Sequence, residues 1–77
     1  MKELTEYMVK ALVDHPEKVV LRERKSNETT ILELSVDSND FRRIIGRDGN
    51  VIKSIRTILN AVALNQKQRP PRLEVLQ

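Results

Sequence analysis

The 77-residue sequence contains no cysteine and no tryptophan, and only one histidine. Without cysteine, neither a disulfide nor a thiolate metal site can reinforce a core that is small in a chain of this length. The single histidine, His15, precedes Pro16 and has no second histidine as a partner. We interpret it as a surface cap at a helix end, not as a ligand or general base. We therefore expect no metal and no cofactor.

Long apolar runs and aromatic residues are also missing. No segment approaches the ~18 apolar residues of a membrane-spanning helix, and Met1 to Glu3 begin a charged, amphipathic segment instead of a signal peptide. These features predict a soluble, cytoplasmic protein with no membrane partner. The only aromatic residues are Tyr7 and Phe41. We expect both to be buried, which would leave no exposed aromatic platform for stacking of bases.

Catalytic groups are not evident. Asp37 and Asp40 could act as an acid/base pair, but their position before a helix is explained by capping of its free N–H groups. Ser35, Ser38 and Ser54 lack a base with an orienting partner. We therefore expect a protein that is not an enzyme and has no small-molecule substrate.

Apolar spacing in the first half predicts a helix and a hairpin. Residues 3–14 have a helical repeat, and proline at position 16 ends the helix because it removes a backbone donor. The apolar face of this helix is expected to contain Leu4, Met8, Ala11 and Leu12. Residues 19–25 and 29–36 alternate as two strands around a polar turn at 26–28. In the second strand, Leu32 and Leu34 are expected on one face and Ile31 on the other.

The second half predicts two helices and a strand. Residues 37–40 cap a short helix that ends at Gly46 and has Phe41, Ile44 and Ile45 on its apolar side. A longer helix runs from Asn50 to about Gln66. We expect its buried stripe to contain Val51, Ile55, Ile58, Leu59, Val62 and Ala63, with Ile52 and Leu64 at the margins.

Residues 72–76 form the last strand, with Leu73 and Val75 pointing inward. The resulting order is α-β-β-α-α-β, which predicts one two-layer α+β domain over residues 1–77. We expect a three-stranded sheet with all three helices on one face.

The only two glycines, Gly46 and Gly49, lie between the two helices of the second half. Glycine permits backbone conformations that a Cβ obstructs, and it lets another backbone come close. The turn precedes the helix that begins near Asn50, where unpaired N–H groups and the helix dipole favour an anion. These features predict a turn that binds the phosphates of a nucleic acid, with the bases read in an adjacent apolar groove.

Charge is distributed unevenly along the chain. Residues 41–77 contain eight Lys or Arg and two acidic residues, a net charge of +6, whereas residues 1–40 carry −3. A basic half of this kind is typical of a surface that meets a polyanion. Arg47 in the turn and Lys53 and Arg56 in the following helix are the expected phosphate contacts. Arg42 and Arg43 either extend this surface or only increase solubility.

The segment around the glycines resembles the core motif of the KH domain, apolar-Ile-Gly-x-x-Gly-x-x-Ile-x-x-Ile. Its fixed positions match the run Ile44-Ile45-Gly46-Arg47-Asp48-Gly49-Asn50-Val51-Ile52-Lys53-Ser54-Ile55. The α-β-β-α-α-β order resembles the type II arrangement of prokaryotic KH domains over essentially the whole chain. In size, the chain is similar to the small stand-alone bacterial KH proteins of the KhpA-like RNA-binding family.

This resemblance implies a non-catalytic clamp on about four nucleotides of single-stranded RNA. The implied role is that of an RNA chaperone or post-transcriptional regulator. Ile45 and Ile52 flank the loop and either line the groove or belong to the core. The implied RNA-binding residues are Ile45, Gly46, Arg47, Asp48, Gly49, Asn50, Ile52, Lys53 and Arg56. The family also implies a protein partner, either a second copy of the chain or a larger Jag-type KH protein.

Asp48 departs from the family pattern, in which the two central loop positions are commonly basic. A carboxylate repels phosphate, so we expect weak, salt-sensitive binding with little sequence preference. Asp48→Lys should then tighten RNA binding. The double change of Gly46 and Gly49 to Asp should abolish binding and leave the fold intact.

Two other functions fit the sequence. In the first, the chain is a dimerisation or scaffold module that pairs with another KH protein, and RNA binding is secondary. In the second, two helices around a glycine turn bind duplex DNA as a helix-turn-helix. The glycine spacing, the flanking isoleucines and the strands on both sides argue against the second.

Overall fold

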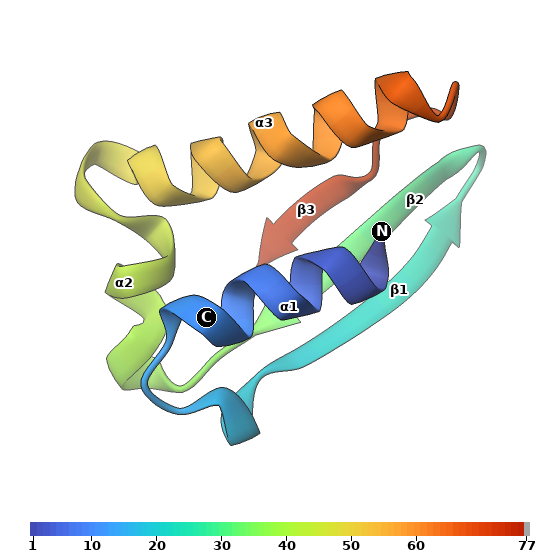
Figure 1. Cartoon of the computed structure of the whole chain (residues 1–77). Coiled ribbons are helices and arrows are strands. Elements are labelled where there is room, and N and C mark those ends of the chain that lie inside the picture. The colour runs from blue at the N-terminus through green and yellow to red at the C-terminus, as the bar shows by residue number, and fades with distance from the viewer. Residues whose placement is uncertain (77) are drawn as a thin grey trace.

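The computed structural model describes residues 1–76, and their elements follow the predicted order. The helices are α1 (Lys2–Leu12), α2 (Phe41–Ile45) and α3 (Asn50–Asn65), and the strands are β1 (Val20–Ser26), β2 (Thr29–Ser35) and β3 (Arg72–Val75). One-turn 3-10 helices at Pro16–Lys18, Ser38–Asp40 and Arg47–Gly49 lie in the connections. The α+β class and the α-β-β-α-α-β order are confirmed, although α1 ends at Leu12 instead of at residue 14 (Figure 1).

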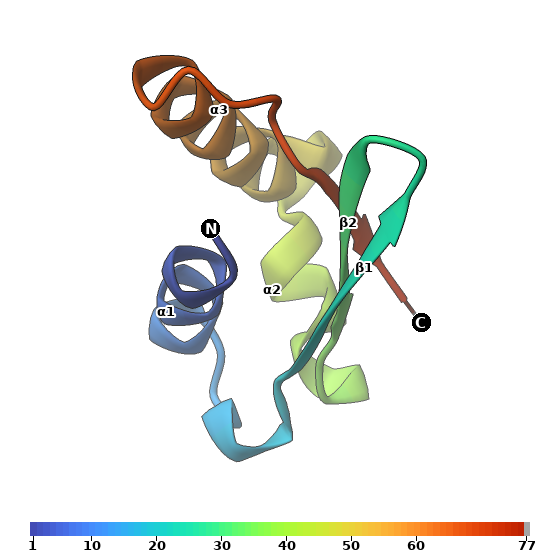
Figure 2. The ribbon, with the colours of Figure 1, turned by 90° about the vertical axis from the view of Figure 1, so that its right-hand side faces the viewer.

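The three strands form one mixed sheet in the order β1-β2-β3. β1 and β2 are antiparallel, with Val20 opposite Ser35, and β3 joins β2 in parallel, with Leu73 opposite Leu32. β3 is therefore an edge strand, and the chain reaches it through α2 and α3. Figure 2 shows all three helices on one side of the sheet, as predicted, with the other face uncovered.

The core lies between this sheet and the helices, and every helix and strand contributes to it. Its buried members are Val9, Leu21, Leu32, Leu34, Ile44, Ile52, Ile55, Leu59 and Leu73. Because α2 and α3 are both anchored by buried isoleucines, the turn between them is held in a fixed place relative to the sheet. Truncating one such side chain to alanine typically costs about 2–5 kcal/mol of stability.

The buried stripe of α3 differs from the predicted one by a rotation of the helix. Ile52, expected at the margin, is 5% exposed, whereas Ile58, expected in the stripe, is 45% exposed. Leu64 is 79% exposed. Most apolar residues of this helix cover one wide arc, and Ala61 and Leu64 lie outside it, so spacing alone does not decide which of them meet the sheet. Packing against β2 and β3 determines which of these apolar residues are buried.

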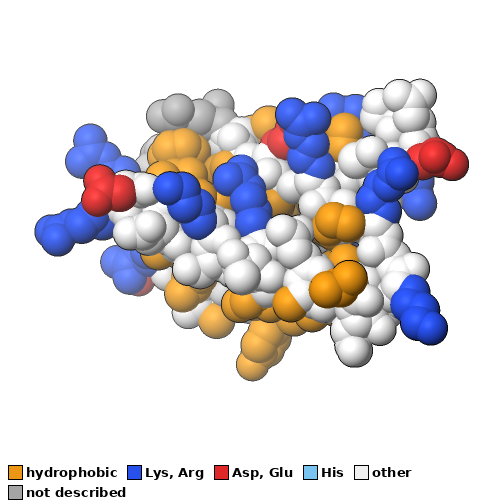
Figure 3. All heavy atoms as spheres, turned by 90° about the horizontal axis from the view of Figure 1, so that it is seen from above, with side chains coloured by type: hydrophobic (Ala, Val, Ile, Leu, Met, Phe, Trp, Pro, Cys, Tyr) orange, Lys and Arg blue, Asp and Glu red, His pale blue; other side chains and the backbone are white. Residues whose placement is uncertain are grey.

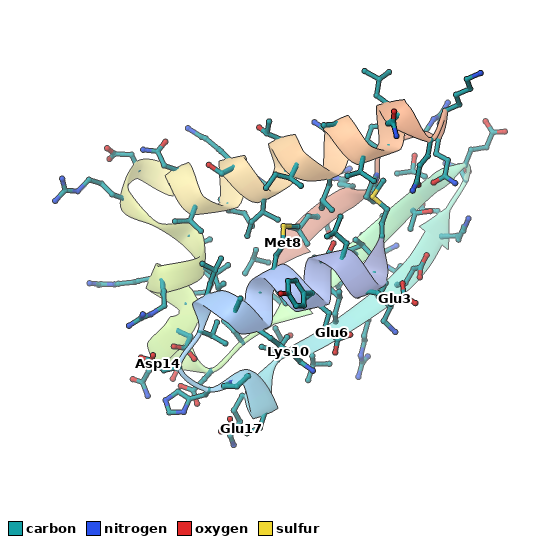
Figure 4. The ribbon with its side chains drawn as sticks, in the orientation of Figure 1. Glu3, Glu6, Met8, Lys10, Asp14 and Glu17 are labelled. Carbon is teal, nitrogen blue, oxygen red and sulfur yellow. The ribbon has the colours of Figure 1, made fainter. Side chains whose placement is uncertain are left out.

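α1 also presents a different face from the predicted one. Thr5 and Val9 are buried, whereas Tyr7 is 75% and Leu12 39% exposed. The prediction that Tyr7 is buried is therefore wrong, while Phe41 is half-buried. The Thr5 hydroxyl donates a hydrogen bond to the carbonyl of Met1 (2.8 Å), which satisfies it inside the core. In Figure 4, Met8 points from α1 toward the side of α3, in agreement with its packing against the core.

A buried carboxylate joins the end of α1 to the start of α2. Asp40 is 1% exposed and accepts hydrogen bonds from the backbone N–H groups of Asp14 (3.1 Å) and His15 (3.0 Å). The Asp14 carboxylate, labelled in Figure 4, in turn pairs with Arg43 of α2 at 3.1 Å. Asp37 caps the following turn as predicted, by accepting from the N–H of Asn39. Asp40 instead links the start of α2 to the segment after α1 through these hydrogen bonds.

The uncovered face of the sheet contains ion pairs. Arg24 of β1 donates to Glu33 of β2 at 2.9 Å, and this hydrogen bond raises the pKa of the Arg24 guanidinium above its ordinary value. On the same face, Ile31 lies between Arg24 and Arg72 in the strand register. Long Arg stems can cover apolar surface, which explains why Ile31 is only 6% exposed on a face without helices.

Candidate nucleic-acid interface

Residues 46–49 make the turn between α2 and α3, and three of the four have positive φ. The values are +77° for Gly46, +55° for Asp48 and +74° for Gly49. The N–H of Asn50 donates to the carbonyl of Arg47 across Asp48 and Gly49. These two residues thus form the centre of a type I′ turn, for which Asp-Gly is a favoured pair. Asp48 therefore has a conformational reason for its place in this loop.

The two glycines are required for different reasons. A Cβ on Gly46 would lie 2.8 Å from the backbone nitrogen of Val51, so a side chain here collides with the first turn of α3. At Gly49 the nearest atom to such a Cβ is the Cε of Lys53, at 3.8 Å, and only the positive φ opposes a side chain. The expectation that aspartate at both positions leaves the fold intact is wrong for Gly46.

The N-terminus of α3 emerges directly from this turn and has no side-chain cap. Its N-cap residue is Gly49, which has no polar side chain. The N–H of Asn50 already donates to Arg47, so the unpartnered N–H groups of the first turn are those that follow it. Together with the positive end of the helix dipole, they lie next to the turn that contains Arg47. An anion such as a phosphate group complements this arrangement, because it accepts hydrogen bonds from these N–H groups.

Exposed cations surround the turn. Seen from the side of α3, Lys and Arg side chains follow one another over the helix and the turn, with few acidic neighbours (Figure 3). Arg43 pairs with Asp14, but no salt bridge within residues 1–76 includes Arg42, Arg47 or Lys53. These three cations are therefore available to an anionic partner.

Two hollows accompany the turn and α3. One, of about 370 Å³, is lined by Phe41, Arg42, Ile45, Gly46 and Arg47. The other, of about 400 Å³, lies between α3 and β3 and is lined by Arg56, Asn60, Pro71, Arg72, Leu73 and Glu74. Across the second groove, the Arg56 guanidinium donates to the carbonyl of Leu73 at 2.9 Å. Each hollow combines apolar and charged walls, as a site for a base beside a phosphate would require.

Most of the residues predicted to bind RNA lie together at this surface. Arg47, Asp48, Asn50, Lys53 and Arg56 are exposed, and Ile45, Gly46 and Gly49 are partly so. Ile52 is the exception, because it packs in the core and has almost no surface to offer a nucleotide.

The sequence predicts no binding role for several residues that line the hollows. It places Phe41 and Leu73 in the core and gives Asn60, Pro71 and Glu74 no role in binding. Asn60 lies one helical turn after Arg56, so the helical repeat of the basic residues was the signal that could have located it.

Comparison with protein families identifies the family to which this sequence belongs. The sequence model of the family described as "KhpA/KhpB, KH domain" matches residues 2–75. The chain belongs to the KhpA/KhpB KH-domain family. This family is non-catalytic, which agrees with the expectation that the chain is not an enzyme.

Curated bacterial relatives support the same family. A protein of Chlamydia pneumoniae is 44% identical over 77 residues, covering 100% of this chain and 97% of the relative. One from Chlamydia muridarum is 51% identical over 63 residues (82% and 81%), and one from Clostridium perfringens 42% over 69 residues (90% and 92%). Each is named "RNA-binding protein KhpA". The search of solved structures found no match.

Two further properties concern the described part of the chain. No helix within residues 1–76 has the length and apolar character needed to cross a membrane. Those residues also contain no cluster of three or more His, Cys, Asp or Glu placed to hold a metal ion.

Proposed function

We propose that the chain is a single type II KH domain that binds single-stranded RNA through the Gly46–Gly49 turn. The observation that carries the proposal is the N-terminus of α3, which has no side-chain cap and lies beside the unpaired Arg47 and Lys53. The names of the relatives, all RNA-binding proteins, and the α-β-β-α-α-β order support it.

In this proposal the phosphates meet the N–H groups of α3, with Arg47 and Lys53 on either side. The bases occupy the hollows beside Ile45 and between α3 and β3. Most of these contacts would be to the backbone, so overall sequence preference is weak and affinity is sensitive to salt. We propose an RNA-chaperone or post-transcriptional role in the bacterial cytoplasm, because contacts made mainly to the RNA backbone would let one small binder accept many RNAs.

Gly49 provides the sharpest test of the turn. Gly49→Asp places a carboxylate where a phosphate would approach, whereas Gly49→Asn has nearly the same shape and no charge. Both residues are among those that tolerate positive φ, so the fold should persist in each, as circular dichroism would verify. Fluorescence anisotropy with a labelled single-stranded RNA should show binding lost in Gly49→Asp and largely kept in Gly49→Asn. Equal affinity of wild type and Gly49→Asp would refute the proposed site.

Competition with duplex nucleic acid tests the helix-turn-helix alternative. Unlabelled single-stranded RNA should displace the labelled probe at a lower concentration than duplex RNA or duplex DNA of the same length. More effective displacement by duplex DNA would favour the helix-turn-helix mode and contradict the clamp.

A second candidate function is pairing with another KH chain, either a second copy or a larger Jag-type protein. The specific observation in its favour is the exposure of apolar residues on α3, where Ile58 is 45% and Leu64 79% exposed. Sedimentation of wild type and Leu64→Ser, each with and without RNA, tests it. A dimer that Leu64→Ser disrupts would support pairing through α3, and one disrupted by Arg47→Ala would instead place the contact at the turn.

A further inference from the structure

The groove between α3 and β3 is bordered by the free edge of the sheet. The N–H of Leu76 donates to the carbonyl of Leu34 in β2 at 2.7 Å, so Leu76 directs its backbone groups toward β2. Successive residues of a strand direct these groups to opposite sides. Leu73, an odd number of positions away, therefore directs its N–H and C=O away from β2 and into the groove. Such edge groups are free to pair with an incoming molecule.

One of these two edge groups, the carbonyl of Leu73, already accepts a hydrogen bond from Arg56. Its guanidinium crosses from α3 and donates to the Leu73 carbonyl at 2.9 Å. The neighbouring carboxylate of Glu74 is engaged as well, because it lies 3.3 Å from Arg72. The remaining N–H donors of Arg56 and the N–H of Leu73 face the groove. Arg56 and Leu73 therefore offer hydrogen-bond donors at this point of the wall, beside the Asn60 amide, which can donate or accept.

We propose that Arg56 is a specificity-determining residue, which makes this groove select bases with a carbonyl on their exposed edge. Uracil and guanine present carbonyl oxygens there, and arginine is a preferred partner of guanine. Cytosine and adenine present an amino group at the corresponding position, so a donor would face a donor. The inference rests on the proposed RNA-binding function and adds the chemistry of one base position to it.

This role differs from the phosphate contact that the sequence predicts for Arg56. The residue lies seven positions beyond Gly49, which is about 10 Å along α3 from the turn. At that distance its guanidinium faces the groove wall and not the N-terminus of the helix. A preference at one base is compatible with weak sequence preference overall, because the other contacts are to the backbone.

Uracil and cytosine form the sharpest pair of probes, since one has a carbonyl and the other an amino group at position 4. Wild type should bind a short all-uridine RNA about fivefold more tightly than an all-cytidine RNA of equal length. In Arg56→Met the aliphatic length is kept, the donors are lost and the Leu73 carbonyl is released to accept from cytosine. The ratio of the two dissociation constants should then fall to about one or invert.

Lys53→Met is the matched control, because it removes one positive charge from the same helix without touching Leu73. It should weaken binding of both RNAs by the same factor and leave their ratio unchanged. An equal ratio in wild type and Arg56→Met, with both RNAs bound, overturns the inference and leaves the proposed function standing. Failure of wild type to bind either RNA overturns both. Circular dichroism of Arg56→Met separates a change of preference from loss of fold.

Discussion

Gly46 and Val51 approach each other so closely that no side chain fits between them. A Cβ on Gly46 would lie 2.8 Å from both the backbone nitrogen and the Cβ of Val51. The glycine therefore allows α2 to end directly against the first turn of α3. This contact places the N-terminus of α3, which has no side-chain cap, directly after the turn that contains Arg47.

The two glycines should respond differently to alanine. At Gly46, alanine encounters both positive φ and the backbone of α3, so we expect a loss of about 2–4 kcal/mol in the free energy of unfolding. At Gly49 only the positive φ opposes it, and the loss should be about 1–2 kcal/mol. Urea denaturation of the two variants measures the difference. Equal losses in the two variants would show that Val51 moves away from the alanine side chain without lowering the free energy of unfolding.

Asp48 is expected to weaken RNA binding, and neutralising it should reverse the effect. Asparagine is the better replacement than lysine, because it tolerates the φ of +55° that this position adopts. Asp48→Asn should tighten binding about two- to fivefold at low salt, the scale of one exposed charge interaction.

The matched control for Asp48→Asn is Glu28→Gln. It makes the same change of charge in the β1–β2 turn, at the opposite end of the molecule from residues 46–49 (Figure 1). Its affinity for RNA should stay close to that of wild type. Equal tightening in both variants would attribute the effect to net charge and not to the loop.

The salt dependence of binding should identify which cations meet phosphate. Loss of one phosphate contact to a single strand reduces the slope of log K against log salt by about 0.7. Arg47→Ala should show this reduction. Lys18→Ala, an exposed lysine in the 3-10 helix after α1, should leave the slope unchanged. Anisotropy titrations over a series of salt concentrations measure both.

Alanine substitutions at two neighbouring residues test which face of α3 is buried. Leu59 is 1% exposed, so Leu59→Ala should cost about 2–5 kcal/mol of stability. Ile58 is 45% exposed, and Ile58→Ala should change stability by less than about 1 kcal/mol. Thermal or urea unfolding distinguishes them. A larger loss for Ile58→Ala than for Leu59→Ala would contradict the observed face of the helix.

The sequence by itself determined the number, type and order of the elements, and the place of the loop. Turn residues and apolar spacing are local signals, and the Gly-x-x-Gly pattern with its flanking isoleucines is specific enough to locate residues 46–49. The basic character of residues 41–77 could also be counted directly.

Only the tertiary structure decided which apolar residues are buried and which polar atoms meet. α1 and α3 each have apolar residues around much of their circumference, so the exposure of Tyr7 and Ile58 depends on where the helices contact the sheet. The pairs Asp40 with His15 and Arg56 with Leu73 lie 25 and 17 positions apart in the chain. Local patterns carry no signal for such contacts, because packing of the core brings the partners together.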